Sequence, residues 1–541
     1  MKNLKVVTIA PQLTDVYFSE ELGICSITAV LREAGYKVLL KPIIKDKEDY
    51  TEIIEFGPDV IGITSYNQTI ELVYKICRDL KKALPNTFIF IGGYASTYHA
   101  KEILTECNEI DGAILGEGER AVIELMDRLK KQENYNDVNG LASKNKMGEI
   151  IVNPRQEYIE NLDELPFPSR DLMGSEGLTI VCSTRGCMRN CFFCCGNDFW
   201  KRENKYSWRA KSIGRFVDEI EYLVKEHNRN QFWIVDASWE DPGFNEKRMC
   251  EFAEEILRRN LKISYFVLIR ATFYKFASKK LMKLLTKSGL CEVFIGTEAA
   301  NSHDLKVLGK NIKVEDNVNC IDFFKKYDIY PEIGFINFNP YSNFEGLRQN
   351  AEFLEEQGFA AFFRYISRVR IYKGSIMHDI LEKDGLLKQT KFYDDDGYNY
   401  KDKRIERLVE YLVKHQALLE KEANLSGELT PFERYYGDKL SHLKMHFKLD
   451  KNEDAIKLIE EHKSELDKIL SDLNILISKW YKKLLDLAEN SWNVDVADRL
   501  CAEYLPPVSL REIFDRLRME RIRFLRNLAR LDKELMKLIR A

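Results

Sequence analysis

The chain has 541 residues, of which 45% are hydrophobic and 31% charged, and its formal net charge is −4. This length predicts about three or four domains, and an aromatic content of 11% with only 13 prolines excludes a largely disordered chain. The small negative charge makes nucleic acid unlikely as a dominant partner, and no apolar run approaches the roughly 18 residues that a membrane span needs.

The first 135 residues alternate short apolar runs with amphipathic helical patterns, which predicts an α/β domain with a doubly wound parallel sheet. Ligands of such sheets bind at the carboxyl ends of the strands. Paired glycines at that edge let backbone amides approach a large polar ligand. The expected binding segments contain Ser65, Gly92, Gly93, Gly116, Glu117 and Gly118.

The remaining chain divides into three parts. Residues 136–177 predict a linker with a hairpin turn at Asn145–Gly148. Residues 178–385 again alternate strand and helix patterns, with a sixth strand expected at 360–369, which suits a partial (β/α)6 barrel. Residues 386–541 contain long helical patterns rich in lysine and glutamate, which predict an all-helical C-terminal domain.

Five of the 12 cysteines fall within residues 182–195, and three of them, Cys187, Cys191 and Cys194, have the spacing C-x3-C-x2-C. A short loop with this spacing can direct three thiolates at one iron–sulfur cluster and leave one iron open for a substrate. The alternative is a zinc knuckle in which Cys182, Cys195 or a histidine supplies a fourth ligand. No second C-x2-C or histidine pair follows at finger spacing, and Cys182 and Cys195 are expected to be spectators.

The loop formed by Cys187, Cys191, Phe193 and Cys194 resembles the C-x3-C-x-aromatic-C loop of the radical S-adenosylmethionine (SAM) superfamily. The glycine-containing segments of residues 1–135 resemble the cobalamin-binding domain fused to one branch of that superfamily. This resemblance covers about residues 1–385. It implies three cofactors: a 4Fe-4S cluster, SAM and cobalamin.

The resemblance also implies roles for individual residues. Cys187, Cys191 and Cys194 would ligate the cluster, with SAM on the fourth iron, and Phe193 would pack near its adenine. The remaining cofactor contacts implied are Asp236, Arg270 and Glu298, which end the second, third and fourth barrel strands. The alternatives are a helix N-cap for Asp236, a surface salt bridge for Arg270 and a helix-start carboxylate for Glu298.

Two departures from the family stand out. The frequent Gly-x-Pro after the fifth strand is Phe338-Asn339-Pro340, so we expect a reshaped active-site floor. The Asp-x-His-x-x-Gly loop that provides a cobalt ligand is replaced by Thr14-Asp15-Val16-Tyr17. His99, the only histidine of the domain, is more typical of a surface histidine, so cobalamin is expected without histidine ligation.

These patterns lead to a hypothesis: a cytoplasmic, cobalamin-dependent radical SAM enzyme, most typical of a C-methyltransferase acting on an unactivated carbon of a peptide or natural-product intermediate. Its expected partners are that substrate and an electron donor such as flavodoxin or ferredoxin. One alternative is a cyclase or rearranging enzyme without methyl transfer, and another is a non-catalytic metal-binding interaction module. His442 with His446, and Asp394-Asp395-Asp396, are weaker candidates for metal sites.

Overall fold

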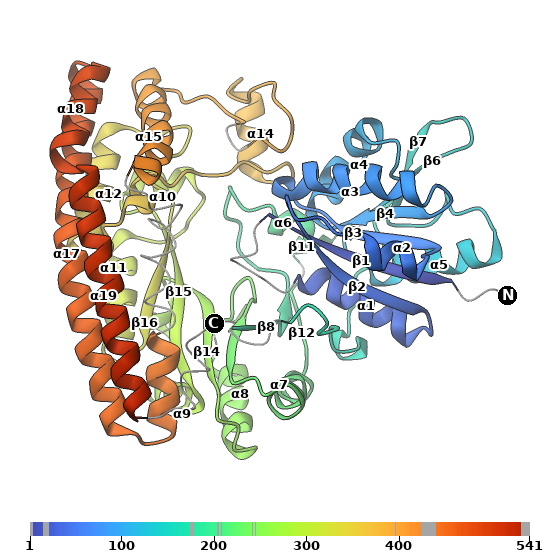
Figure 1. Cartoon of the computed structure of the whole chain (residues 1–541), viewed down its shortest axis with the longest axis horizontal. Coiled ribbons are helices and arrows are strands. Elements are labelled where there is room, and N and C mark those ends of the chain that lie inside the picture. The colour runs from blue at the N-terminus through green and yellow to red at the C-terminus, as the bar shows by residue number, and fades with distance from the viewer. Residues whose placement is uncertain are drawn as a thin grey trace.

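The computed structural model describes the chain except residues 1–3, 14–20, 174–177, 203–204, 207, 241, 244, 395–396, 423–439 and 532–541. A first sheet with its helices, a second sheet and a group of long helices follow one another along the long axis of the molecule (Figure 1). Within the described residues, no helix is both long enough and apolar enough to cross a membrane.

The N-terminal sheet confirms the predicted parallel alternation. Its parallel strands are β1 (Lys5–Gln12), β2 (Lys37–Ile44), β3 (Val60–Thr64), β4 (Phe88–Gly92) and β5 (Gly112–Ile114). The predicted hairpin adds β6 (Leu141–Lys144), which pairs antiparallel with β5, and β7 (Ile150–Val152), which pairs antiparallel with β6. The strand order is β2-β1-β3-β4-β5-β6-β7. The hairpin of the expected linker therefore extends the first sheet.

Helices cover both faces of this sheet. Their buried apolar residues form separate cores, one under α1 (Leu22–Glu33) and α5 (Glu119–Lys131), and the other under α2 (Thr51–Phe56), α3 (Ile70–Ala83) and α4 (Tyr94–Glu106). A short helix, η1 (Asn67–Thr69), precedes α3, and η2 (Leu162–Glu164) lies in the connection to the second sheet.

The second sheet is parallel, with the order β16-β15-β14-β13-β8. Its strands are β8 (Thr179–Val181), β13 (Gln231–Ile234), β14 (Ser264–Arg270), β15 (Leu290–Glu298) and β16 (Tyr330–Phe335). The helices between them are α7 (Ile213–His227), α8 (Lys247–Arg258), η3 (Phe273–Lys275), α9 (Lys279–Ser288), α10 (Ser302–Val307) and α11 (Val314–Lys325), and α12 (Phe344–Glu356) follows β16. The short elements around the cysteine loop are β9 (Thr184–Arg185), α6 (Gly196–Phe199), β10 (Lys201–Arg202), β11 (Lys205–Tyr206) and β12 (Arg209–Ala210).

The sixth strand predicted at residues 360–369 is wrong. The segment contains a helical turn, α13 (Phe362–Tyr365), and its only sheet pairing among the described residues is a single bridge between Phe338 and Arg368. The ring of Phe362 stacks on Trp480 at 5.6 Å between centroids, and Tyr365 stacks on Tyr481 at 4.5 Å. Packing against the C-terminal helices thus outweighs the strand propensity of the segment.

The C-terminal region is helical, as predicted. Its helices are α14 (Ile376–Lys383), α15 (Lys403–Glu422), a helix over residues 440–449, α17 (Glu453–Asn490), α18 (Val494–Tyr504) and α19 (Pro507–Leu531). The long helix α17 lies against α12 of the barrel on one side and α19 on the other (Figure 1). Apolar residues of α17 and of the barrel strands belong to one continuous core, so the helices are an integral part of the barrel's packing.

Candidate functional site

The three cysteines of the C-x3-C-x2-C motif lie in the loop between β9 and α6. Burial raises the pKa of the Cys191 thiol to about 11, and the charges of Cys194 and Cys187 act in the same direction. Such mutual influence requires the three sulfur atoms to lie near one another. All twelve cysteines are described and none forms a disulfide. The loop therefore offers the thiolate donor set that suits an iron–sulfur cluster.

The two neighbouring cysteines are placed differently. The Cys182 thiol donates hydrogen bonds to the carbonyl of Thr184 at 2.9 Å and to Asp236 at 3.5 Å. Burial raises the pKa of both Cys182 and Cys195 to about 12. These hydrogen bonds hold the Cys182 sulfur against Thr184 and Asp236, which argues against Cys182 as the fourth ligand of a zinc knuckle.

The middle of the cysteine loop is anchored through Phe192. Its backbone N–H donates to the carbonyl of Leu308 at 2.9 Å, and its carbonyl accepts from the N–H of Met377 at 2.7 Å. A Cβ atom at Gly309, which has a φ of +68°, would lie 2.3 Å from the Phe192 ring. The loop is thus fixed between the end of α10 and the start of α14, while Phe193 packs partly buried against the barrel core.

Asp236 follows β13 and is fully buried. Its carboxylate accepts hydrogen bonds from the backbone N–H of Ser183 at 2.7 Å and of Thr184 at 2.9 Å, and also from the Ser183 hydroxyl. Both carboxylate oxygens are therefore engaged in shaping the chain just before the cysteine loop. This contact differs from the expected one with the SAM amine and from a helix N-cap.

Glu298, at the end of β15, has a backbone φ of +63°, which is unusual for a residue other than glycine. A Cβ atom at Gly296 would lie 3.0 Å from its Oε1, and one at Gly334 would lie 3.3 Å from its Oε2. The carboxylate therefore rests over the glycines of two adjacent strands at their carboxyl ends, where barrel enzymes bind their substrates.

Lys310 is a residue of this site that the sequence analysis missed. Its Nζ lies 3.4 Å from Oε1 of Glu298, and only 10% of its side chain is exposed. Burial opposes a charge on Lys310, yet Glu298, Cys191 and Cys187 together raise its pKa. A buried ammonium group beside the cysteines suits an anionic cluster or a carboxylate. No motif in the sequence marks this lysine.

Two arginines, Arg189 and Arg270, also lie near the first cysteine of the loop. The backbone N–H of Arg270 donates to Oε1 of Glu240 at 2.9 Å, and the Nε of Arg270 lies 3.6 Å from the same oxygen. Burial lowers the pKa of Arg189, the charge of Arg270 adds to this effect, and the charge of Cys187 opposes it. Arg270 thus has a buried partner, unlike the surface salt bridge that was the alternative for it, and both arginines add positive charge near Cys187.

The chain after β16 forms a network of polar side chains where the family has Gly-x-Pro. The side-chain amide of Asn339 donates to Asp304 at 2.8 Å, and that of Asn337 donates to the Tyr481 hydroxyl at 2.7 Å. Asn337, Asn339 and Asp304 are all buried. This network connects the end of β16 to α17, so the C-terminal helices contribute to the floor of the barrel.

A cavity of about 400 Å³ lies between the carboxyl edge of the first sheet and the start of the cysteine loop. Gly92, Gly93 and residues 116–118 line it from the sheet, and Cys182 and residues 184–186 line it from the barrel. A Cβ atom at Gly93, whose φ is +101°, would lie 2.7 Å from the Ser65 carbonyl oxygen. Glycine backbone beside a cavity at the carboxyl edge of a parallel sheet is typical of a ligand-binding site. Ser65 itself points its hydroxyl at the Gly92 carbonyl, 2.8 Å away, and is not among the lining residues.

Glu117 and Glu119, which follow β5 of the first sheet, form ion pairs with arginines of the barrel. The guanidinium of Arg185 lies 2.6 Å from Oε1 of Glu117 and 2.6 Å from Oε1 of Glu119, and that of Arg209 lies 2.9 Å from Oε2 of Glu117. The N–H of Ile159 also donates to Glu117 at 3.0 Å. Glu117 therefore lines the cavity with its carboxylate already paired to the barrel.

His99 is not among the residues that line this cavity. It is buried, its ring stacks on Phe392 with 4.1 Å between centroids, and its Nδ1 lies 3.8 Å from Glu102. Burial lowers its pKa to about 4. The expectation of a surface histidine is wrong, but the position agrees with cobalamin lacking this ligand. The substituted loop Thr14–Tyr17 lies outside the described residues.

The weaker metal candidates are not supported. The Nδ1 of His442 lies 2.7 Å from the Ser264 hydroxyl in a buried position, whereas the Nε2 of His446 lies 3.5 Å from Asp450. The two histidines thus have separate partners. Asp395 and Asp396 of the acidic turn lie outside the described residues.

Comparison with known families gives matches over both sheets. The B12 binding domain matches residues 14–126, and the radical SAM superfamily matches residues 181–354. Together these matches cover the cavity loops of the first sheet and the cysteine loop with most of the barrel.

Curated relatives include enzymes of two kinds. An uncharacterized methyltransferase of Pyrococcus horikoshii is 27% identical over 353 residues, which cover 62% of this chain and 74% of that protein. An anaerobic magnesium-protoporphyrin IX monomethyl ester cyclase of Rubrivivax gelatinosus is 30% identical over 297 residues, 53% of this chain and 52% of the cyclase. The chain thus spans about half of the length of that cyclase.

Two solved structures share the fold. The cobalamin-dependent SAM radical enzyme OxsB, with aqua-cobalamin and SAM bound, superposes with a TM-score of 0.66 at 18% identity, covering 93% of this chain and 83% of OxsB. The radical SAM methyltransferase TsrM of Kitasatospora setae, with cobalamin and a [4Fe-4S] cluster bound, gives 0.58 at 14% identity, covering 72% and 76%. The OxsB match extends over the C-terminal helices as well.

Proposed function

Because the chain belongs to the radical SAM superfamily and carries a B12-binding domain, we propose that it is a cobalamin-dependent radical SAM C-methyltransferase. Its substrate is an unactivated carbon of a peptide or natural-product intermediate. The observation that carries the proposal is the cavity that the glycine loops of the first sheet share with the start of the cysteine loop. A methyl donor held there faces the site at which a substrate radical would form.

We propose the following cofactor contacts. Cys187, Cys191 and Cys194 ligate the 4Fe-4S cluster. Lys310 and Glu298, at the carboxyl end of β15, bind the carboxylate and the amine or ribose of SAM, and Phe193 packs near its adenine. Arg270 contributes positive charge near Cys187, and Asp236 fixes the backbone at the start of the cysteine loop. Gly92, Gly93, Gly116 and Gly118 line the cobalamin cavity.

When bound, the cluster and SAM supply one-electron chemistry that removes a hydrogen atom from carbon, and cobalamin supplies a methyl group. The protein's own contribution is placement and exclusion of water. The pairing of Arg185 with Glu117 holds the cobalamin loops against the cysteine loop. The Asn337–Tyr481 contact closes the floor of the barrel with α17, which keeps solvent from a reactive carbon centre.

The test is anaerobic reconstitution of the full chain with iron, sulfide and hydroxocobalamin, followed by reduction in the presence of SAM labelled in its methyl group. We expect a 4Fe-4S signal in electron paramagnetic resonance (EPR), cobalamin uptake and release of 5′-deoxyadenosine. Absence of both SAM cleavage and cobalamin uptake contradicts the proposal. The neighbouring genes, which can encode a precursor peptide or biosynthetic enzymes, guide the choice of substrate.

A second candidate is a cyclase or rearranging enzyme in which no methyl group is transferred. Its specific support is the 30% identity to the magnesium-protoporphyrin IX monomethyl ester cyclase. The labelled methyl group distinguishes the two, since only the methyltransferase transfers it to the product. The enzymes among the relatives argue against a non-catalytic metal-binding module.

The proposal extends to organisation and partners. We assign residues 1–135 to the cobalamin-binding domain, 136–177 to the linker and its hairpin, 178–385 to the radical SAM barrel and 386–541 to the helical domain. The electron donor is a flavodoxin or ferredoxin. Twelve cysteines without a disulfide suit the reducing conditions of the cytoplasm.

A further inference from the structure

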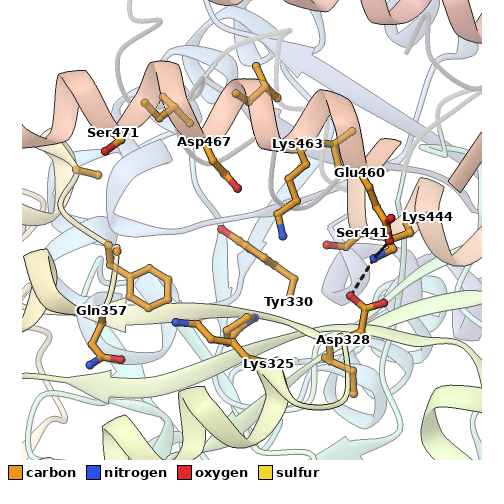
Figure 2. Close-up of a pocket in the computed structure, with 18 of the residues that line it drawn as sticks. Lys325, Asp328, Tyr330, Gln357, Ser441, Lys444, Glu460, Lys463, Asp467 and Ser471 are labelled. Carbon is orange, nitrogen blue, oxygen red and sulfur yellow. Dashed lines mark hydrogen bonds and ion pairs between the residues drawn. The ribbon is translucent and has the colours of Figure 1, made fainter. Parts of the chain in front are cut away.

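A second cavity, of about 600 Å³, lies at the opposite end of the barrel from the cysteine loop. Its barrel wall contains Cys291, at the beginning of β15, and Tyr330 and Pro331, at the beginning of β16. The six residues of β16 span about 20 Å, so this basal cavity is separate from the cofactor site. Its other wall is formed by α17 and the helix over residues 440–449 (Figure 2).

The lining of the basal cavity combines apolar side chains with polar and charged ones. Phe359 is buried at its base, and Leu466 and Leu470 line it from α17. The side-chain oxygen of Asn474 is buried at the wall and has no hydrogen-bond partner among the described residues. Cavities of this size that combine apolar walls with polar groups commonly hold small organic ligands, and an unsatisfied amide in the wall favours a polar occupant.

The charges that line the basal cavity do not cancel. Lys444 lies 2.9 Å from Asp328 and 3.0 Å from Glu460, and Lys448 pairs with Asp328. These two lysines and two carboxylates balance one another. Two further charged residues of the lining, Arg364 and Glu355, form ion pairs with residues outside the lining. Arg364 pairs with Glu332, and Glu355 pairs with Lys482.

What remains is Lys325 and Lys463 against Asp467, a net of one positive charge. Neither lysine has a carboxylate of the described residues within 4.0 Å. The Nζ of Lys463 lies 5.8 Å from the ring centroid of Tyr330, and that of Lys325 lies 5.9 Å from that of Phe359. Figure 2 shows the two lysines entering the cavity from opposite walls, with Tyr330 near both.

We propose that the basal cavity binds a singly charged organic anion. Its anionic group lies between Lys325 and Lys463, and its apolar or aromatic body lies against Phe359, Leu466 and Leu470. The single net positive charge of the lining favours a ligand with one negative charge. The apolar side chains of the lining favour a ligand with a hydrophobic body over an inorganic ion. Because α17 also carries Tyr481, which contacts Asn337, the ligand binds to the helix that closes the floor of the proposed active site.

The test uses the full chain and the fluorescent sulfonate 1-anilinonaphthalene-8-sulfonate (ANS), which has one negative charge on an aromatic body. We expect saturable binding at one site. The double substitution K325Q/K463Q is expected to weaken ANS binding at least tenfold while binding of the uncharged analogue N-phenyl-1-naphthylamine changes little. The matched control is K457Q, which removes an exposed lysine of the same helix outside the cavity lining.

A second variant, S471W, places an indole at the rim of the cavity and is expected to abolish binding of both dyes. Unchanged ANS affinity in K325Q/K463Q, or unchanged binding of both dyes in S471W, overturns the proposal. Displacement of ANS by benzoate, compared with displacement by phenyl phosphate, distinguishes a carboxylate from a phosphate ligand. These measurements require no cofactor, so their outcome is independent of the proposed methyl transfer.

Discussion

Arg185 lies 2.6 Å from Glu117, and this contact joins the turn after β5 to the strand that precedes the cysteine loop. The exposed fraction of the Arg185 side chain is 18% and that of Glu117 is 4%. The nearby carboxylates of Glu119 and Glu117 raise the pKa of Arg185 in spite of its burial. The two domains that are proposed to hold cobalamin and the cluster are thus connected by a buried ion pair two residues before Cys187.

Replacing Arg185 by glutamine is expected to lower the free energy of unfolding by about 3 kcal/mol, because it leaves buried carboxylates with fewer partners. Arg209 remains beside Glu117, which limits the loss. Urea unfolding measures the effect. The control is K225Q, which removes an exposed partner of Glu221 and is expected to change stability little. Equal effects of the two substitutions contradict a structural role for the Arg185 pair.

Substituting any one of Cys187, Cys191 and Cys194 by alanine is expected to abolish the 4Fe-4S signal and most bound iron after anaerobic reconstitution. Each removal deprives the cluster of one of three protein ligands. The control is C195A, in the same loop, which is expected to retain iron. If C195A lost iron and C194A retained it, Cys195 rather than Cys194 would be the third ligand. Zinc instead of iron in the purified wild type would support the knuckle.

The substitution G93A is expected to prevent cobalamin uptake. The new Cβ atom would lie 2.7 Å from the Ser65 carbonyl oxygen, so the loop must move. The matched control is G148A, because Gly148 also has a positive φ, +82°, but nothing lies within 4 Å of a Cβ there. Both substitutions strain the backbone by about 1–2 kcal/mol. Retained uptake of hydroxocobalamin by G93A, followed by absorbance, is the contrary result.

Replacing Lys310 by glutamine is expected to leave cluster assembly intact and to weaken SAM binding about tenfold, the order expected for loss of one charge-assisted hydrogen bond. The EPR spectrum of the reduced cluster provides the readout, since it changes when SAM binds. K306Q removes an exposed lysine on the adjacent helix α10 and serves as the control. If both variants bind SAM as the wild type does, Lys310 has no part in the SAM site.

Stability is expected to fall between pH 7.5 and 5.5 partly because of His442. Burial lowers its pKa to about 3 in the folded protein, whereas an unfolded histidine has a pKa of about 6.5. Below pH 6.5 the unfolded state therefore binds the proton first, and the folded state loses about 1 kcal/mol by pH 5.5. In H442Q this part of the loss is absent. Urea unfolding of both proteins at the two pH values measures the difference, and equal pH dependence would contradict the assignment.

Local patterns in the sequence were sufficient for the parallel sheets, the hairpin at Asn145–Gly148 and the long C-terminal helices. Each depends on side chains close together in sequence, whose periodicity fixes which face is buried. The segment 360–369 was the exception. Its apolar residues fit a strand as well as a helix, and the stacking of Phe362 on Trp480 decided between them.

The sequence by itself determined the cysteine spacing and the order of strands and helices, because a C-x3-C-x2-C loop and an apolar period are properties of neighbouring residues. Only the tertiary structure brought Lys310 to Glu298, Glu117 to Arg185, and Asn337 to Tyr481. Such contacts join residues that lie far apart in the chain or on different elements, and a spacing pattern carries no information about them. The packing of barrel, sheet and helices around shared cores settles which charged groups become buried together.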